Sequence, residues 1–134
     1  MNTRLLMIFS ALLMGVAGLL MEFMPHEILR FFGEAPIGGI APLLVQLAGA
    51  LYLGFAMTNW MAKGVLIGGI YARPLAVGNF AHFLIGALAL LKFAVGLPNL
   101  WLVWVFAVIY ALLAILFGFV FFTHPLKTKD ASGK

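Results

Sequence analysis

The sequence lacks cysteine and has few charged residues. Without cysteine the chain has no disulfide, no thiolate metal site, no iron–sulfur cluster and no cysteine nucleophile. Its 134 residues include only 8 Lys and Arg and 4 Asp and Glu, whereas 65% are hydrophobic. Soluble domains are typically about 45–50% apolar and about 25% charged. Because small folds leave much of their surface exposed, this composition predicts an integral membrane protein.

Catalytic and cofactor motifs are absent as well. The sequence has no phosphate-binding loop, no HExxH, no GxSxG and no acidic metal cluster, so we assign no catalytic residue and no metal ligand. A bis-histidine haem needs two histidines at one depth, and His26 and His124 do not match His82, so no cofactor is expected. The net charge of +4 is spread over segment ends and the tail, which argues against nucleic acid as a partner.

Four apolar segments are long enough to cross a membrane, since a bilayer core about 30 Å thick needs roughly 20 helical residues. The predicted helices cover residues 5–24, 40–62, 75–95 and 100–122. They predict one all-α domain over residues 1–126, a four-helix up-and-down transmembrane bundle, with a disordered polar tail at 127–134. We expect the first segment to be a retained anchor rather than a signal peptide. A third helix beginning near Val65 is an alternative, but it draws Arg73 into hydrocarbon.

Local signals mark the helix ends. Asn2 suits the N-cap of the first helix, and Pro42 and Pro74 suit the first turns of the second and third. Between the first two segments, Pro25 and Gly33 bound a short additional helix with apolar side chains. We expect this helix to lie in the outer membrane interface.

Lys and Arg are distributed unequally between the two membrane sides. With a cytoplasmic N-terminus, the inner side carries Arg4, Lys63, Arg73, Lys127, Lys129 and Lys134, and the outer side carries Arg30 and Lys92. Because cytoplasmic loops are enriched in Lys and Arg, we expect both termini in the cytoplasm.

Polar residues within the predicted membrane helices are the candidate ligand-binding residues, because hydrocarbon penalises unpaired polar groups. They are Glu22, Gln46, Asn59, Asn79, His82 and Lys92. At about 1.5 Å per residue, three of them predict an outer polar layer: Glu22, Gln46 and Lys92. One interpretation is a structural ion pair between the two charged residues, or snorkelling to headgroups. The other is a ligand or proton site in which the amide of Gln46 donates a hydrogen bond.

The remaining candidates lie deeper. Asn79, His82 and Gly86 share one helix face, and Asn59 is a natural partner near the inner surface. We favour helix–helix association, with Gly86 allowing close approach. A proton relay or a headgroup contact at His82 is the alternative.

Small and aromatic residues complete the pattern. Small residues recur four apart in two pairs, Ala11 with Gly15 and Ala50 with Gly54, which predicts close packing or a dimer face. The aromatic end of the last helix is predicted to face lipid; it comprises Phe117, Phe119, Phe121 and Phe122.

The order of features resembles small four-helix bacterial membrane families of the DoxX-like and uncharacterised kind. The matching features are Pro25 to Ile28, the run from Gln46 to Gly54, Asn59-Trp60, Arg73-Pro74, Gly78-Asn79 and His82. The resemblance covers most of the chain and implies a four-helix bundle in the bacterial inner membrane. It implies no catalytic residue.

Three functions are compatible with these residues. The leading one is a non-enzymatic protein that binds membrane lipids, a small amphipathic ligand, a membrane protein partner or a second copy of itself. The second is a small dimeric transporter or channel. The third is a membrane enzyme acting on a lipid or quinone, which requires an acid–base pair.

Overall fold

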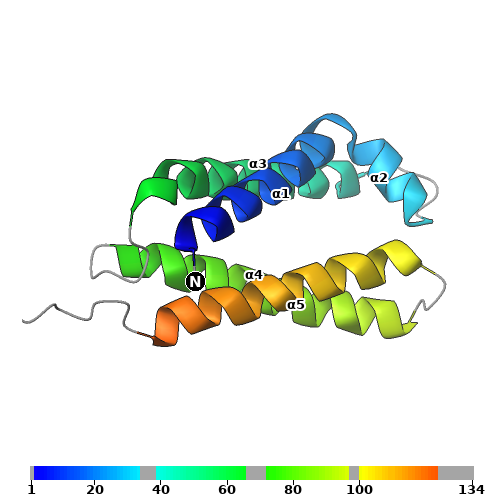
Figure 1. Cartoon of the computed structure of the whole chain (residues 1–134). Helices are drawn as coiled ribbons and strands as arrows, with labels where there is room; N and C mark the ends of the chain where they lie inside the picture. Colours follow the sequence, from blue (N-terminus) through cyan, green and yellow to red (C-terminus); the bar gives the residue numbers. More distant parts are fainter. Residues whose placement is uncertain (1, 34–38, 66–71, 97–99, 124–134) are drawn as a thin grey trace, which may run out of the picture. The chain divides into compact units, whose positions relative to one another are not determined.

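The computed structural model describes residues 2–33, 39–65, 72–96 and 100–123. These residues form helices α1 (Thr3–Phe23), α2 (Pro25–Phe31), α3 (Ala41–Met61), the 3-10 turn η1 (Ala62–Gly64), α4 (Arg73–Gly96) and α5 (Trp101–Phe122) (Figure 1). No strand occurs in the described ranges. Four helices are long and apolar enough to cross a membrane: α1, α3 with η1, α4 and α5. The predicted all-α class with four membrane-length helices is therefore confirmed.

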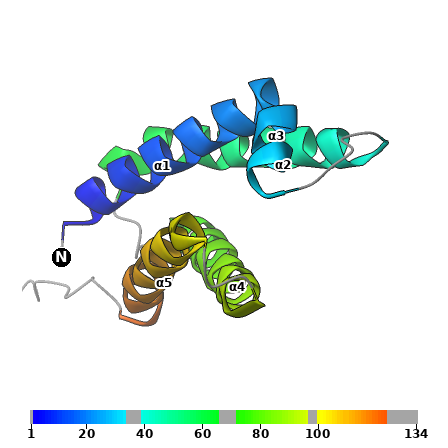
Figure 2. The same ribbon diagram turned by 90° about the vertical axis from the view of Figure 1, so that its right-hand side faces the viewer.

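The chain divides into two compact units, Met1–Gly64 and Val65–Lys134. Each unit is built on two antiparallel membrane-length helices, α1 with α3 in the first and α4 with α5 in the second (Figure 2). The loop residues 66–71 and the turn at Pro98-Asn99 lie outside the described ranges.

Local chemistry explains the ends of the helices in the first unit. The side chain of Asn2 accepts hydrogen bonds from the backbone N–H groups of Arg4 and Leu5, so the predicted N-cap is confirmed. After α1 ends at Phe23, Pro25 occupies the first turn of α2, where its missing N–H leaves no donor unsatisfied.

The short helix α2 ends as its sequence predicts. Glu27 lies in its first turn and Arg30 in its last, which matches the sign of the helix dipole at each end. Gly33 then adopts a φ of 86° and its N–H donates to the carbonyl of Arg30. The location of α2 in the membrane interface stays a prediction.

Glycines set the closest approach of α1 and α3. A Cβ built on Gly49 would lie 2.9 Å from the backbone nitrogen of Glu22 and 3.0 Å from the carbonyl oxygen of Gly18. A Cβ on Gly18 would likewise lie 3.0 Å from the carbonyl oxygen of Gly49. The two helix backbones are therefore in direct contact, which only small residues allow.

The predicted small-residue pairs match this packing in part. Ala11 is buried, and a Cβ on Gly15 would lie 3.6 Å from the Cβ of Ala56, so the pair on α1 belongs to the contact. The pair on α3 makes no close contact, because Ala50 is exposed and nothing lies within 4 Å of a Cβ on Gly54. The dimer face that this pair suggests stays a prediction.

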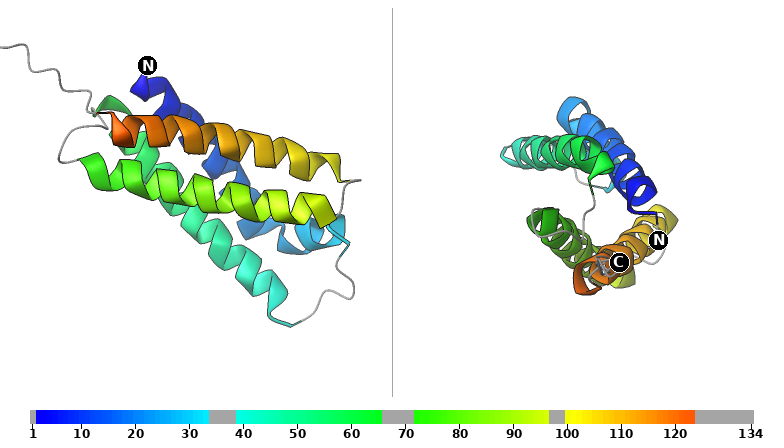
Figure 3. Two further views of the ribbon diagram at one scale, coloured as in Figure 1. Left: turned by 90° about the horizontal axis from the view of Figure 1, so that it is seen from below. Right: turned by 60° about the vertical axis from the view of Figure 1, so that its left-hand side comes forward.

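Helices α4 and α5 lie side by side (Figure 3). Aromatic rings fill the contact between them. Phe83 is fully buried, stacks on Phe117 at 5.7 Å between ring centroids, and meets the Tyr110 ring edge-on at 5.1 Å. The prediction that Phe117 faces lipid is therefore wrong, whereas Phe119 and Phe122 are 57% and 71% exposed. Phe117 and the two exposed phenylalanines lie on different faces of α5, because successive residues are rotated by about 100°.

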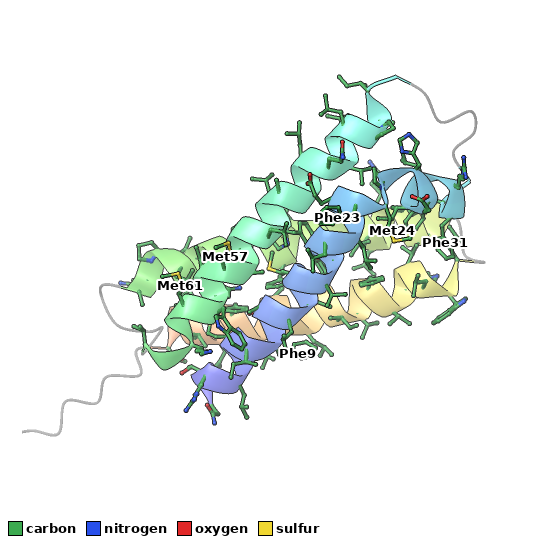
Figure 4. All side chains as sticks on the ribbon, turned by 90° about the horizontal axis from the view of Figure 1, so that it is seen from above. Phe9, Phe23, Met24, Phe31, Met57 and Met61 are labelled. Atoms are coloured by element: carbon green, nitrogen blue, oxygen red, sulfur yellow. The ribbon has the colours of Figure 1, made fainter. Side chains whose placement is uncertain are left out.

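Large apolar side chains cover the outside of the first unit. Figure 4 shows Phe9 and Phe23 projecting from α1, Phe31 from α2, and Met57 and Met61 from α3. Phe23 and Met61 are 76% and 79% exposed. An extended apolar surface of this kind is unfavourable in water and suits a hydrocarbon solvent, in agreement with the membrane-length helices.

Candidate functional site

The six candidate ligand-binding residues are divided between the two units. The first unit holds Glu22, Gln46 and Asn59, and the second holds Asn79, His82 and Lys92. The structure brings Glu22 and Gln46 together within the first unit. The expected pairs of Glu22 with Lys92 and of Asn59 with Asn79 combine residues of both units and stay predictions.

Gln46 contacts the backbone of Glu22. The Nε2 atom of Gln46 donates a hydrogen bond to the carbonyl oxygen of Glu22 at 3.2 Å. This oxygen belongs to the last turn of α1, where carbonyl groups have no partner within the helix. Gln46 thus joins α3 to the end of α1. Both residues are half-buried, and the carboxylate of Glu22 has no ion pair within the described part of its unit.

Asn59 belongs to a buried polar cluster at the other end of the same helix pair. It is fully buried, and its Nδ2 atom donates to the hydroxyl oxygen of Ser10 at 3.1 Å. The Ser10 hydroxyl in turn donates to the carbonyl of Met7 at 3.1 Å, and the sulfur of Met14 lies 4.0 Å from Asn59 Nδ2. The cluster joins α1 to α3, which is the common role of such bonds in membranes.

Sequence reasoning missed the part that Ser10 plays in this cluster. A usable signal was present, because Ser10 follows Arg4 by six residues and Asn59 precedes Lys63 by four. Measured from these basic residues at one end of the unit, the two polar side chains lie at similar depth.

Asn79 and His82 lie on α4. Asn79 is fully buried, and its Nδ2 atom donates to the carbonyl of Leu75 one turn earlier at 3.0 Å. The His82 ring lies 5.1 Å from the Phe83 ring and 5.7 Å from the Tyr110 ring, so it extends the aromatic contact with α5. A Cβ on Gly86 would come within 2.7 Å of the Tyr110 ring. The close approach expected at Gly86 is therefore confirmed, although its partner is a ring and not a backbone.

Lys92 is exposed near the end of α4. It has no ion pair within the described residues of its unit, and residues 65–123 contain no Asp or Glu. The lysine is thus a cation in a hairpin whose two helices hold no anion.

An apolar groove runs between α4 and α5. Its volume is about 250 Å³. Its walls are Phe80, Leu84, Ala87, Leu88, Leu91, Ala111, Ala114, Ile115 and Gly118. Ala87 and Ala114 are buried and form the floor, while Leu88 and Ile115 are 61% and 68% exposed and form the rim. The groove was not predicted from the sequence, although small residues on α5 and leucines on α4 form its walls.

The groove can hold a narrow apolar group. None of its wall residues carries a polar side chain, so it offers neither acid nor base nor nucleophile. Its volume lies below the roughly 300–1,000 Å³ of sites for drug-sized ligands. Among the described residues no group of three or more His, Cys, Asp and Glu is placed to hold a metal ion.

Comparison with protein-family models, with curated proteins and with solved structures finds no match to this chain.

Proposed function

We propose that this chain is a non-enzymatic membrane protein that binds a lipid-like ligand, with one apolar chain of the ligand in the groove between α4 and α5. The proposal rests on the apolar groove, which has a volume of about 250 Å³ and lies on a hairpin of two membrane-length helices.

The position of the groove favours a ligand that arrives through the bilayer. From Phe80 to Leu91 the groove follows α4 for eleven residues, which is about 16 Å at 1.5 Å per residue. This stretch lies within a helix of 24 residues, so most of it belongs to the hydrocarbon region if α4 spans the membrane. A solute with polar groups along its length is disfavoured there.

The shape of the groove favours a chain over a bulky ring system. The small side chains of Ala87, Ala111 and Ala114 leave space at the bottom of the groove, and the exposed side chains of Leu88 and Ile115 form its edges. A methylene chain between such walls touches protein on several sides, and its many weak dispersion contacts add up. A chain that lies on an ordinary helix surface touches protein on one side only.

The aromatic surroundings of His82 favour ligand binding over transport. A proton-coupled pathway requires a wet cavity at His82, and two of its neighbours are the rings of Phe83 and Tyr110. The same proposal includes a bacterial inner-membrane location and cytoplasmic termini. The resemblance to DoxX-like families supports the first and the distribution of Lys and Arg supports the second.

The test uses a phosphatidylcholine with a photoactivatable diazirine on its acyl chain, added to the full chain in nanodiscs. We expect crosslinks to concentrate on peptides containing Phe80–Leu91 and Ala111–Gly118. Ala111→Phe should fill the groove and reduce this labelling severalfold, with Ala111→Leu intermediate. The matched control is Leu112→Phe, because Leu112 is 55% exposed and lies outside the groove.

Each outcome bears on the proposal. Labelling that is retained in Leu112→Phe and lost in Ala111→Phe, with helical circular dichroism unchanged in both, supports it. Uniform labelling that extends to exposed positions outside these two stretches, such as Val95 and Val108, and is unaffected by Ala111→Phe refutes it, because this is the pattern of lipid that merely surrounds a helix.

A further inference from the structure

We infer that the groove selects an acidic phospholipid, whose phosphate pairs with Lys92 while one acyl chain lies between α4 and α5. The inference rests on the proposed function and adds the chemical class of the ligand. Three observations lead to it: the position of Lys92 relative to the groove, the charges of the hairpin, and the depth of Lys92 along α4.

Lys92 stands at one end of the groove. It follows Leu91 directly and lies one helical turn beyond Leu88, and both leucines form groove walls. Residues four apart share a helix face, so Lys92 continues the rim that Leu88 begins. Its side chain is exposed, and its long apolar stem can extend along the leucines while the ammonium group remains at the groove end.

The charges of the hairpin favour an anion. Between residues 65 and 123 the cations are Arg73 and Lys92, and there is no Asp or Glu. Arg73 lies at the opposite end of α4, with its guanidinium carbon 5.6 Å from the centroid of the Phe121 ring. Lys92 has no ion pair within the described part of this unit. A cation in a membrane-length helix is unfavourable without a counter-charge, and the groove beside Lys92 supplies none.

The depth of Lys92 fits the position of a lipid phosphate. Lys92 precedes the end of α4 at Gly96 by four residues, which is about 6 Å. At this end of the hairpin α5 begins with Trp101, which is 70% exposed, and Trp104 follows one turn later. Exposed tryptophans are typical of the membrane interface, where phosphates lie.

The length of the site fits one lipid chain. From Lys92 to Phe80 the site follows α4 for twelve residues, or about 18 Å. One leaflet contributes about 15 Å, half of a hydrocarbon core about 30 Å thick. A chain that spans one leaflet from a phosphate at Lys92 thus follows most of the groove. Because the rim residues are exposed along the hairpin, this chain can enter sideways without leaving the bilayer.

A headgroup with net negative charge should be preferred to a zwitterionic one. A zwitterionic lipid brings its own cation close to the phosphate and weakens the attraction of Lys92. One basic residue near a membrane surface contributes about 1 kcal/mol with acidic lipid, and this corresponds to roughly a fivefold preference.

The experiment is native mass spectrometry of the full chain, released from nanodiscs that contain equal amounts of phosphatidylglycerol and phosphatidylcholine with identical acyl chains. We expect wild type to retain phosphatidylglycerol with about fivefold preference. Lys92→Gln should abolish the preference and Lys92→Arg should keep it. The matched control is Lys63→Gln, because Lys63 is a lysine outside the hairpin, in η1 directly after α3, with its Nζ atom 3.2 Å from the centroid of the Trp60 ring.

The variants separate failure of this inference from failure of the proposed function. If Ala111→Phe loses both lipids while Lys92→Gln still prefers phosphatidylglycerol, the groove binds lipid and the role of Lys92 is wrong. If Ala111→Phe retains both lipids, the proposed function is wrong and the inference falls with it. Displacement of phosphatidylglycerol by an equal concentration of oleate identifies a free fatty acid as the preferred ligand and overturns the phospholipid assignment.

A structural role for Lys92 gives a different result. If Lys92→Gln lowers the melting temperature, and adding Glu22→Gln restores it without any change in lipid preference, the counter-charge of Lys92 is the Glu22 carboxylate. That outcome overturns the inference.

Discussion

Replacing Gly49 by Ala should destabilise the first unit, whereas replacing Gly54 on the same helix should not. Both glycines lie in the interior of α3, where glycine is roughly 0.5–1 kcal/mol less favourable than alanine. Nothing lies within 4 Å of a Cβ on Gly54. Gly54→Ala should therefore keep the full gain in helix propensity and be neutral or stabilising.

At Gly49 the same methyl group collides with backbone. Its Cβ would lie 2.9 Å from the nitrogen of Glu22 and 3.0 Å from the carbonyl oxygen of Gly18. Backbone atoms cannot rotate away as the end of a side chain can, so α1 and α3 must separate. Overpacking of this kind costs about 1–3 kcal/mol, and the two variants should differ by that amount.

The assay is reversible unfolding of each full-length variant in mixed micelles, followed by helical circular dichroism. Gly15→Ala provides a second control, because its Cβ would lie 3.6 Å from the Cβ of Ala56, at ordinary contact distance, so that it also causes no clash. We expect Gly49→Ala to have the lowest free energy of unfolding, with Gly15→Ala and Gly54→Ala neutral or stabilised. Equal stability of Gly49→Ala and Gly54→Ala would refute the close contact of the two helix backbones.

Three further predictions concern packing and orientation. Ser10→Ala removes the acceptor of the Asn59 amide and should lower the free energy of unfolding by about 0.6 kcal/mol, the average for interhelical hydrogen bonds in a membrane. An unchanged free energy of unfolding contradicts the role of the cluster. Phe117→Ala deletes a fully buried ring and should cost about 3 kcal/mol, while Phe119→Ala, on the exposed side, should cost much less in the same assay. A fluorescent-protein fusion at the C-terminus should be bright and an alkaline phosphatase fusion inactive, since cytoplasmic termini are predicted from the Lys and Arg distribution; the opposite pattern reverses the orientation.

The helix ends were predictable from the sequence because their causes are local. Asn2 caps α1 through its own side chain, and Pro25 and Pro42 occupy first turns where a missing N–H does no harm. The lengths of the apolar segments were sufficient to predict the number of membrane-length helices. These signals need no knowledge of which helix packs against which.

The packing faces were not predictable in the same way, because apolar residues occur on every side of α3. Gly49 and Ala50 are neighbours in the sequence, yet Gly49 touches α1 and Ala50 is exposed. A shift of one residue rotates the chosen face by about 100°, so a small-residue spacing alone selects the wrong face easily. Phe117 and Phe119 illustrate the same rotation on α5.

The groove was not predictable because it depends on pairs of residues from two helices. Ala111 and Ala114 on α5 are small residues typical of close helix contacts, and in a tightly matched pair a partner helix would fill the space above them. Leu84 and Leu88 on α4 instead lie at the edge, so an open groove remains. Whether the space between two helices is filled or open depends on how each helix is rotated about its own axis.

The polar side chains of the two hairpins differ in the partners that they contact, and this difference bears on function. Asn59 and Gln46 donate to atoms on α1, and Asn79 donates within α4. The amides of Asn59 and Gln46 therefore join α3 to α1, whereas the Asn79 amide bonds to the backbone of its own helix. Lys92 differs, because the hairpin that carries it has no anion and the apolar groove begins beside it. Since a charge in a membrane-length helix is unfavourable without a counter-charge, Lys92 is the residue to which our proposal assigns recognition of the ligand.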